Sequence, residues 1–334
     1  MPVALTELGR GGPLVSRVGL GLMGMSGVYG PADETESKAT IHAALDAGIT
    51  LFDTGDFYGM GHNELLLRDA LRGIDRASVF IQVKFGGQRD PRGAFVGHDA
   101  RPAMVKSSLA YSLTRLGTDY IDLYQPARLD DHVPIEETVG AITEMIEAGY
   151  VRYLGLSEMG VGTIRRAAAV HPVTALQIEY SLMSRGIEDT TLPAMRELGV
   201  GVTAYGVMSR GLLSAASARA IGPGDPRGRF PRFQGENLQR NIELVTALEQ
   251  VAADRSVTTA QLAIAWVLSR GTDIVPLIGT KHRDRLAEAL GALDLTLSPD
   301  ELAAIEASVP SSQVAGERYE PAQMAALDSE RPST

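Results

Sequence analysis

Short apolar segments alternate with amphipathic segments along most of the chain. The apolar segments are rich in Val, Ile and Leu, and we expect strands at residues 17–20, 49–53, 79–84, 120–124, 151–156, 175–179, 201–205 and 274–278. The amphipathic segments have helical periodicity and predict helices at residues 34–47, 63–72, 101–116, 135–148, 162–170, 188–198, 236–253, 258–269 and 283–292. Eight short apolar strands, each followed by a helix, are typical of a parallel sheet covered on both faces. Closed on itself, such a sheet gives an α/β fold of the (β/α)8 TIM barrel class.

Cap residues agree with these boundaries. Several predicted helices end at a Gly just before the next strand, where a C-cap belongs, at Gly48, Gly149, Gly199 and Gly271. Thr258 and Ser298 stand where helix N-caps are expected. The 334 residues fit one large barrel domain of roughly 250 residues plus insertions.

Three regions fall outside the repeat. We expect the residues before Arg17 to form a small hairpin over the N-terminal end of the barrel. A long loop at residues 209–235, rich in Gly, Pro and Arg, follows the seventh strand, and a tail covers residues 310–334. Long segments of this kind in a barrel are usually functional lids or mobile ends.

Composition excludes several classes of function. The formal net charge is −10 and no Lys/Arg run is present, so we expect no nucleic-acid partner. The absence of Cys removes disulfides and thiolate chemistry and fits a reducing cytoplasm. No signal-peptide pattern and no apolar run of roughly 18 residues are found, so we expect a cytoplasmic protein with no membrane contact. No two His residues share an i, i+4 spacing, so no metal site is predicted.

A Gly-rich motif follows the first predicted strand. Residues 19–24 match G-x-G-x-x-G, the dinucleotide fingerprint, but that fingerprint needs a helix to begin inside the motif. Here the helical pattern begins only near residues 32–35, after further Gly and Pro. We therefore interpret the motif as the loop leaving the first strand, on the catalytic face of a barrel. From there Gly21, Leu22 and Met23 can contact a cofactor through the backbone.

Polar residues at the ends of the second and third strands suggest the chemistry. Asp53 ends one strand, Tyr58 lies on the loop that follows, and Lys84 ends the next strand. An unpaired ammonium is costly to bury, so we expect Lys84 to pair with Asp53. We also expect Lys84 to lower the pKa of Tyr58 by favouring the phenolate. Such a Tyr can protonate an alkoxide as it forms.

A set of motifs spread in order along essentially the whole chain resembles one family. These motifs are Gly19-Leu20-Gly21, Phe52-Asp53-Thr54, Tyr58-Gly59, Gly61, Asn63-Glu64, Lys84, Gly155-Leu156-Ser157 and Gln177-Ile178-Glu179-Tyr180-Ser181. They are similar to those of the aldo-keto reductases. The resemblance implies a (β/α)8 barrel that binds NAD(P)H without a Rossmann domain and reduces aldehydes and ketones by hydride transfer. It also implies that Asp53, Tyr58 and Lys84 are catalytic.

The resemblance further implies how the cofactor is held. Asp53, Ser157 and Gln177 would lie at the nicotinamide, with Ser157 and Gln177 on its carboxamide, and Tyr205 would stack on the ring. The cofactor loop would continue through Gly206, Val207 and Met208.

The phosphate end of the cofactor is expected after the eighth strand. The resemblance places it on Ile278, Gly279, Thr280 and Lys281. This placement has independent support, because the loop after the eighth strand and the next helix N-terminus form the usual phosphate site of barrels. Lys281 and Arg285, with Glu288 beside them, suit a 2′-phosphate, which favours NADPH.

One position departs from the family. Most relatives have a His at the end of the fourth strand as a second donor to the substrate carbonyl, and here that position is Ala127. Removing one preorganised donor costs about 10²–10³ in rate. A water, Arg128, His62 or the substrate itself could replace it.

The surrounding residues suggest a substrate. Gln125, Ala127-Arg128 and Asp130, with the tail segment Gly316-Glu317-Arg318-Tyr319, resemble the pyridoxal reductase branch of the family. Pyridoxal carries a phenolic hydroxyl beside its aldehyde, which could supply an internal hydrogen bond. The alternative hypothesis is an NADPH-binding sensor or regulatory subunit with little turnover, which Ala127 permits and the set Asp53, Tyr58 and Lys84 disfavours.

Overall fold

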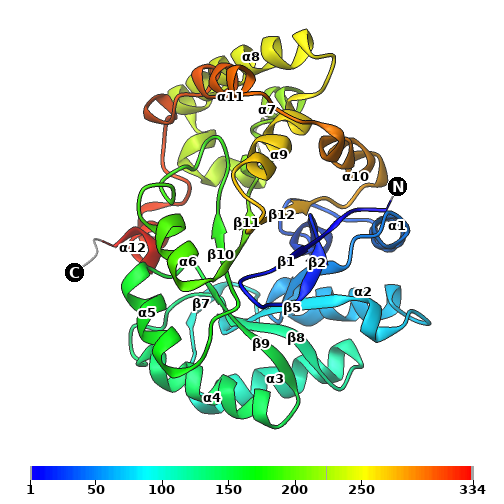
Figure 1. Ribbon diagram of the computed structural model, residues 1–334, viewed down its shortest axis with the longest axis vertical. Helices are drawn as coiled ribbons and strands as arrows, with labels where there is room; N and C mark the ends of the chain where they lie inside the picture. Colours follow the sequence, from blue (N-terminus) through cyan, green and yellow to red (C-terminus); the bar gives the residue numbers. More distant parts are fainter. Residues whose placement is uncertain (1, 223, 332–334) are drawn as a thin grey trace.

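A closed barrel of parallel strands forms the centre of the computed structural model, which describes residues 2–222 and 224–331 (Figure 1). Pro223 of the predicted loop and residues 332–334 of the predicted tail lie outside the described residues, as does Met1. The barrel strands are β3 (Gly19–Gly21), β4 (Leu51–Gly55), β5 (Phe80–Phe85), β8 (Ile121–Pro126), β9 (Val151–Ser157), β10 (Ala175–Glu179), β11 (Gly201–Tyr205) and β12 (Ile274–Gly279). The strands neighbour one another in this order and β12 pairs with β3 to close the barrel, which confirms the predicted fold class.

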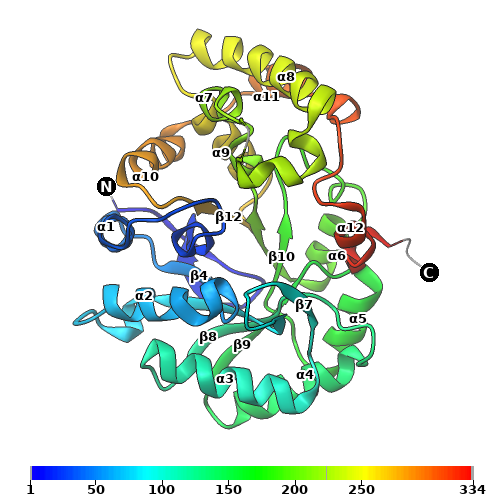
Figure 2. The same cartoon turned by 180° about the vertical axis from the view of Figure 1, so that it is seen from behind.

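Helices surround the barrel on its outer side (Figures 1 and 2). They are α1 (Glu34–Asp46), α2 (His62–Ala70), α3 (Pro102–Leu116), α4 (Ile135–Glu147), α5 (Val161–Val170), α6 (Thr191–Leu198), α8 (Gly235–Asp254), α9 (Thr259–Ser269), α10 (Arg283–Leu290) and α11 (Pro299–Ser308). The predicted N-caps are confirmed, because Thr258 and Ser298 each form a capping box with the residue three positions later. Among the described residues, none of the helices has the length and apolar content to cross a membrane.

A hairpin closes the N-terminal end of the barrel, as predicted. It consists of β1 (Leu5–Glu7) and β2 (Leu14–Ser16), which pair antiparallel. Leu8 and Val15 are fully buried and pack with barrel-interior side chains such as Leu51. The backbone at Leu8–Gly9 lies so close to Gly201 that a Cβ there would stand 2.5 Å from the Gly9 nitrogen. The barrel interior is therefore filled at this end, and chemistry must take place at the other.

Most predicted boundaries agree with the structure within two residues, and two of the differences have a clear cause. The first barrel strand begins at Gly19 rather than 17, because the Arg17 N–H donates to the Ala4 carbonyl at 2.8 Å and so joins Arg17 to the N-terminal hairpin. Helix α6 begins at Thr191 rather than 188, because residue 188 belongs to a turn in which Arg185 binds the Glu188 carboxylate at 2.8 Å.

The segments outside the repeat contain short helices, turns and a hairpin. The hairpin of β6 (Gly87–Arg89) and β7 (Phe95–His98), which the sequence pattern did not predict, follows β5. The loop 209–235 contains α7 (Ala215–Arg219), and the tail contains α12 (Pro321–Ala325) beside α5 and α6 (Figure 1). The 3-10 turns are η1 (Met23–Ser26), η2 (Tyr58–Gly61), η3 (Arg76–Ser78), η4 (Ser209–Gly211), η5 (Pro226–Arg229), η6 (Pro231–Phe233), η7 (Gly291–Asp294), η8 (Ser311–Gln313) and η9 (Asp328–Glu330).

Gly201 in β11 allows a test of how closely the N-terminal hairpin packs against the barrel. Gly201→Ala should lower the free energy of unfolding by about 1–3 kcal/mol, because the added methyl group meets backbone that cannot move aside. Gly140→Ala is the matched control within α4, where a Cβ meets nothing within 4 Å, and it should stabilise by about 0.5–1 kcal/mol. Denaturant unfolding of the two variants measures both effects, and equal effects would contradict the packing described.

Candidate active site

A buried ion pair lies where β4 and β5 run side by side. The Lys84 Nζ stands 2.5 Å from the Asp53 Oδ1, and the two residues are 4% and 5% exposed. The same Asp53 oxygen accepts hydrogen bonds from the amide nitrogens of Gln177 at 2.8 Å and Gln82 at 3.1 Å. Four side chains from three strands are thereby fixed around one oxygen. The predicted pairing of Lys84 with Asp53 is confirmed.

Tyr58 lies beside this ion pair. The turn η2 carries it, and Gly59 and Met60 adopt left-handed φ angles of 56° and 55° that bend the chain sharply there. The Lys84 Nζ stands 5.2 Å from the centroid of the Tyr58 ring, and the edge of Phe57 packs against that ring with centroids 4.9 Å apart. Tyr58 is 6% exposed.

The expectation that Lys84 lowers the pKa of Tyr58 is wrong for this arrangement. Burial raises the pKa of the Tyr58 hydroxyl well above 10, and the Asp53 carboxylate raises it further. The Lys84 charge is offset by the carboxylate that it touches, so burial and Asp53 prevail. Tyr58 therefore keeps its proton at neutral pH.

The residues predicted for the nicotinamide come together at the ends of β9, β10 and β11. Ser157 is the register partner of Gln177, and its buried Oγ has no hydrogen-bond partner among the described residues. An orphaned hydroxyl beside an amide suits a carboxamide that both accepts and donates. Tyr205 ends β11, and its hydroxyl donates to the Glu158 Oε1 at 2.6 Å. A nicotinamide therefore fits the donor set at this end of the site.

The two segments predicted for the rest of the cofactor lie side by side. Gly21 is the register partner of Gly279, so the loop of Leu22 and Met23 adjoins the segment from Ile278 to Thr280. A Cβ at Gly279 would meet nothing within 4 Å, which leaves room for a ligand against the backbone.

The basic residues of this region surround the start of α10. The Lys281 ammonium donates to the carbonyls of Gly30 and Pro31, and the half-exposed Arg285 pairs with Glu288 at 2.9 Å. At the N-terminus of α10, the N–H of Arg283 donates to the Glu36 carboxylate at 3.0 Å and that of Arg285 to the Asp284 carboxylate at 2.8 Å, so a phosphate would have to compete with these acceptors. The basic side chains could hold phosphate oxygens.

Arg210 is a residue that the sequence interpretation missed. It follows Gly206, Val207 and Met208 in a left-handed conformation (φ 56°), and its guanidinium lies 4.4 Å from the Phe230 ring centroid and 4.5 Å from that of Tyr319. Its Nη2 lies 3.4 Å from the Glu179 carboxylate, whereas its Nη1 is buried without a hydrogen-bond partner among the described residues. A buried cation with a free donor could hold an anionic part of a cofactor. An Arg directly after the predicted cofactor loop was the signal in the sequence.

Ala127, at the position where most relatives have a His, is buried and held by its backbone. Ala127 is 2% exposed and its N–H donates to the Phe85 carbonyl. The next residue, Arg128, forms no ion pair with the residues described, and its Nη1 donates to the Ala127 carbonyl at 2.5 Å. The Arg128 charge acts on the site. It opposes burial at Tyr58, whose pKa burial raises, and it adds to burial at Lys84, whose pKa burial lowers. His62 instead lies at the surface, where its Nδ1 contacts the Ser26 hydroxyl.

No group of three or more metal-ligating side chains occurs within residues 2–222 and 224–331.

The comparisons agree with this fold. Residues 17–310 match the Aldo/keto reductase family. The chain is 42% identical over 319 residues to "Probable aldo-keto reductase 1" of Glycine max, and the matched region covers 94% of this chain and 91% of that protein. It is 39% identical over 317 residues to the aldo-keto reductase yakc of Schizosaccharomyces pombe, whose name carries NADP(+), with 93% of each chain covered. The solved glycerol dehydrogenase from Gluconobacter oxydans has a similar fold, with a TM-score of 0.83 at 29% identity, over 92% of this chain and 96% of that one.

The chain belongs to the aldo-keto reductase family. It is therefore an oxidoreductase of the class that reduces carbonyl groups of small molecules with a nicotinamide cofactor.

A second acidic group lies behind Tyr58. Asp56 has a buried Oδ1 without a hydrogen-bond partner among the described residues, and the carboxylate of Glu64 is also buried nearby. Burial, followed by the charge of Glu64, raises the pKa of Asp56 from 3.8 to about 7, and Arg115 offsets only part of this.

Asp56 should therefore make stability depend on pH. The folded chain holds this proton more tightly than the unfolded chain, so its contribution is complete below about pH 4 and is lost as the pH rises through about 7. Asp56→Asn removes this titration. The free energy of unfolding of the variant minus that of the wild type should increase from pH 4 to pH 7 and then level off. A difference that stays flat across this interval, in urea unfolding at each pH, would contradict the account.

Proposed function

We propose that the chain reduces an aldehyde or ketone with NADPH and that Tyr58 is the proton donor. The observation that carries this proposal is the buried Lys84–Asp53 pair packed beside a protonated Tyr58. When bound, the cofactor supplies the hydride. Tyr58 gives its proton to the oxygen of the carbonyl as that oxygen becomes an alkoxide, a far stronger base than a phenolate. The Lys84 ammonium, 5.2 Å from the ring and partly offset by Asp53, reduces the cost of the phenolate that remains without cancelling it.

Several groups support a nicotinamide cofactor, and those near the start of α10 favour NADPH over NADH. Ser157, Gln177 and Tyr205 would hold the nicotinamide end, as argued from the orphaned Ser157 hydroxyl. Lys281 and Arg285 would hold the 2′-phosphate at the start of α10. The NADP(+) in the name of the yeast relative points the same way.

Arg128 is the best replacement for the missing His. It is the candidate whose charge acts on Tyr58 and Lys84, whereas His62 lies at the surface. A guanidinium without an acidic partner among the described residues suits a substrate with an anionic oxygen close to its carbonyl. Pyridoxal, with a phenolic oxygen beside its aldehyde, is such a substrate.

The first test removes the proposed proton. Tyr58→Phe should lower turnover by about 10²–10⁴ while NADPH binding stays within about twofold, because the ring and its packing remain. Tyr111→Phe, on the surface at 65% exposure, is the matched control and should be unchanged. NADPH oxidation with a panel of carbonyls measures turnover. Unchanged turnover in Tyr58→Phe would remove Tyr58 from the mechanism, and NADPH binding without turnover in the wild type would favour the regulatory hypothesis.

The second test concerns the substrate. We expect the wild type to reduce pyridoxal with a higher kcat/KM than benzaldehyde, because only pyridoxal offers an anionic oxygen to Arg128. Arg128→Met should lower kcat/KM for pyridoxal by about 10²–10³ and remove most of this preference. Arg101→Met, at an exposed ion pair with Asp99, is the control. Equal or better turnover of benzaldehyde by the wild type would rule out the preference for pyridoxal.

A further inference from the structure

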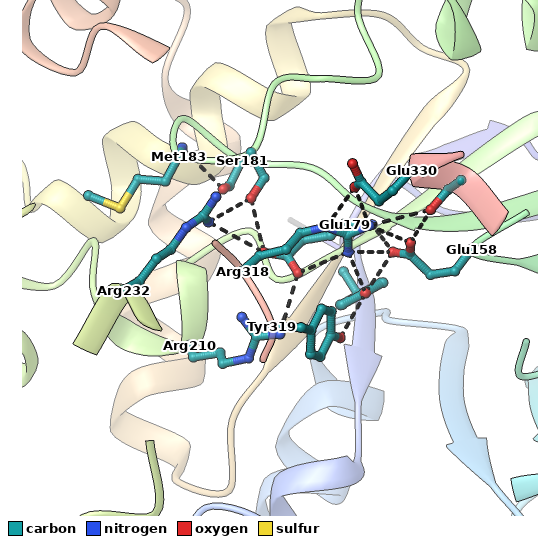
Figure 3. Close-up of polar contacts among 12 residues, drawn as sticks. Glu158, Glu179, Ser181, Met183, Arg210, Arg232, Arg318, Tyr319 and Glu330 are labelled. Carbon is teal, nitrogen blue, oxygen red and sulfur yellow. Dashed lines mark hydrogen bonds and ion pairs between the residues drawn. The ribbon is translucent and has the colours of Figure 1, made fainter. Parts of the chain in front are cut away.

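The C-terminal tail reaches the nicotinamide end of the site through a buried arginine. Arg318 is 7% exposed at its side chain and binds both carboxylate oxygens of Glu158, at 2.6 and 2.9 Å. It also contacts Glu330 at 2.7 Å and Glu179 at 3.4 Å. Figure 3 shows Arg318 among these carboxylates, with Tyr319 next to it.

Glu158 joins three barrel strands to the tail. Its carboxylate accepts hydrogen bonds from the Glu179 N–H at 3.0 Å and from the Tyr205 hydroxyl at 2.6 Å. In the tail, the Ser329 hydroxyl donates to the same carboxylate at 2.7 Å. The backbone N–H of Glu158 donates to the Gln177 carbonyl at 2.9 Å. One fully buried side chain therefore contacts the ends of β10 and β11 while its backbone continues β9.

The backbone of Glu158 is strained. Its φ is 54°, a left-handed conformation that a residue with a side chain adopts only when its surroundings enforce it. Burial disfavours the charge of Glu158, but Arg318 outweighs it and holds the pKa of this carboxyl at about 2. The carboxylate that ties this strained residue to β10 and β11 is thus kept ionised by the tail.

Three of the four residues expected at the nicotinamide lie next to Glu158 in the chain or form a hydrogen bond with it. Ser157 precedes Glu158 in the chain, Gln177 accepts the Glu158 N–H, and Tyr205 donates to its side chain. We propose that Arg318 is a positioning residue for nicotinamide binding, which acts by fixing Glu158, by donating to the Tyr205 hydroxyl at 3.2 Å and, through Glu158, by holding the ends of β9 and β10. This role rests on the proposed function, because it presumes that these three residues bind the nicotinamide.

The test uses a substitution that retains a charge, because an unpaired buried Glu158 would destabilise the whole fold. Arg318→Lys keeps the cation but cannot hold two carboxylate oxygens in a planar fork. We expect the Kd and KM for NADPH to rise about tenfold, with KM for the carbonyl substrate unchanged within about twofold. Arg331→Met is the matched control, since Arg331 also ties the tail to the barrel, by an exposed pair with Asp131 at 2.7 Å, but does not bind Glu158. It should leave all three constants unchanged.

A double-variant cycle with Tyr205→Phe separates positioning from general stability. If Arg318 acts through the Tyr205 hydroxyl, the effect of Arg318→Lys on the Kd for NADPH should fall below about threefold in the Tyr205→Phe background. The full tenfold effect in that background would overturn the route through Tyr205, and equal effects of Arg318→Lys and Arg331→Met would overturn the role of Arg318.

A milder variant covers the case in which Arg318→Lys does not fold. Glu330→Gln removes a half-exposed partner of Arg318 and should raise the KM for NADPH about threefold, again without changing the KM for the carbonyl. An unchanged KM for NADPH would overturn the proposal. Failure of the wild type to bind NADPH would instead overturn the proposed function, and the positioning role with it.

Discussion

An ammonium and a carboxylate lie in contact inside this protein, and the arrangement of the site depends on them. Taking two charges out of water costs several kcal/mol per ion, and only close contact with further hydrogen bonds recovers it. Asp53 and Lys84 meet both conditions, because two glutamine amides donate to the same carboxylate oxygen. The barrel supplies this precision, since β4 and β5 are neighbouring parallel strands whose register is set by backbone hydrogen bonds. Tyr58 can then lie against a fixed charge rather than a mobile one.

The same principle recurs at the other side of the site. Glu158 is buried and ionised, and Arg318, from the far end of the chain, compensates its charge. The barrel floor is closed by the N-terminal hairpin, while the tail lies over the ends of the strands where the cofactor is expected. Residues outside the eight-fold repeat thus complete the barrel at both ends.

The barrel and the central ion pair were predictable because each depends on local patterns. Strands 175–179 and 201–205 have clear apolar runs, the second after Gly199 at the preceding helix end, and their bounds agree with the structure. The Asp53–Lys84 contact follows from the cost of burying an unpaired ammonium. The pKa of Tyr58 was predicted in the wrong direction, because the degree of burial and the neutralisation of Lys84 by Asp53 appear only in three dimensions. Arg318 and Arg210 were missed as site components for a similar reason. Each lies far along the chain from the carboxylates it contacts, and an isolated Arg in a loop is usually solvated.

The central claim is that this site transfers a hydride to a carbonyl carbon while Tyr58 protonates the oxygen. Its most direct test is the reduction of pyridoxal by the wild type with NADPH that carries deuterium at both C4 positions. Mass spectrometry of the product alcohol should show deuterium bound to the carbinol carbon, in an amount equal to the NADPH consumed. Consumption of NADPH with no deuterium in the alcohol would contradict the account.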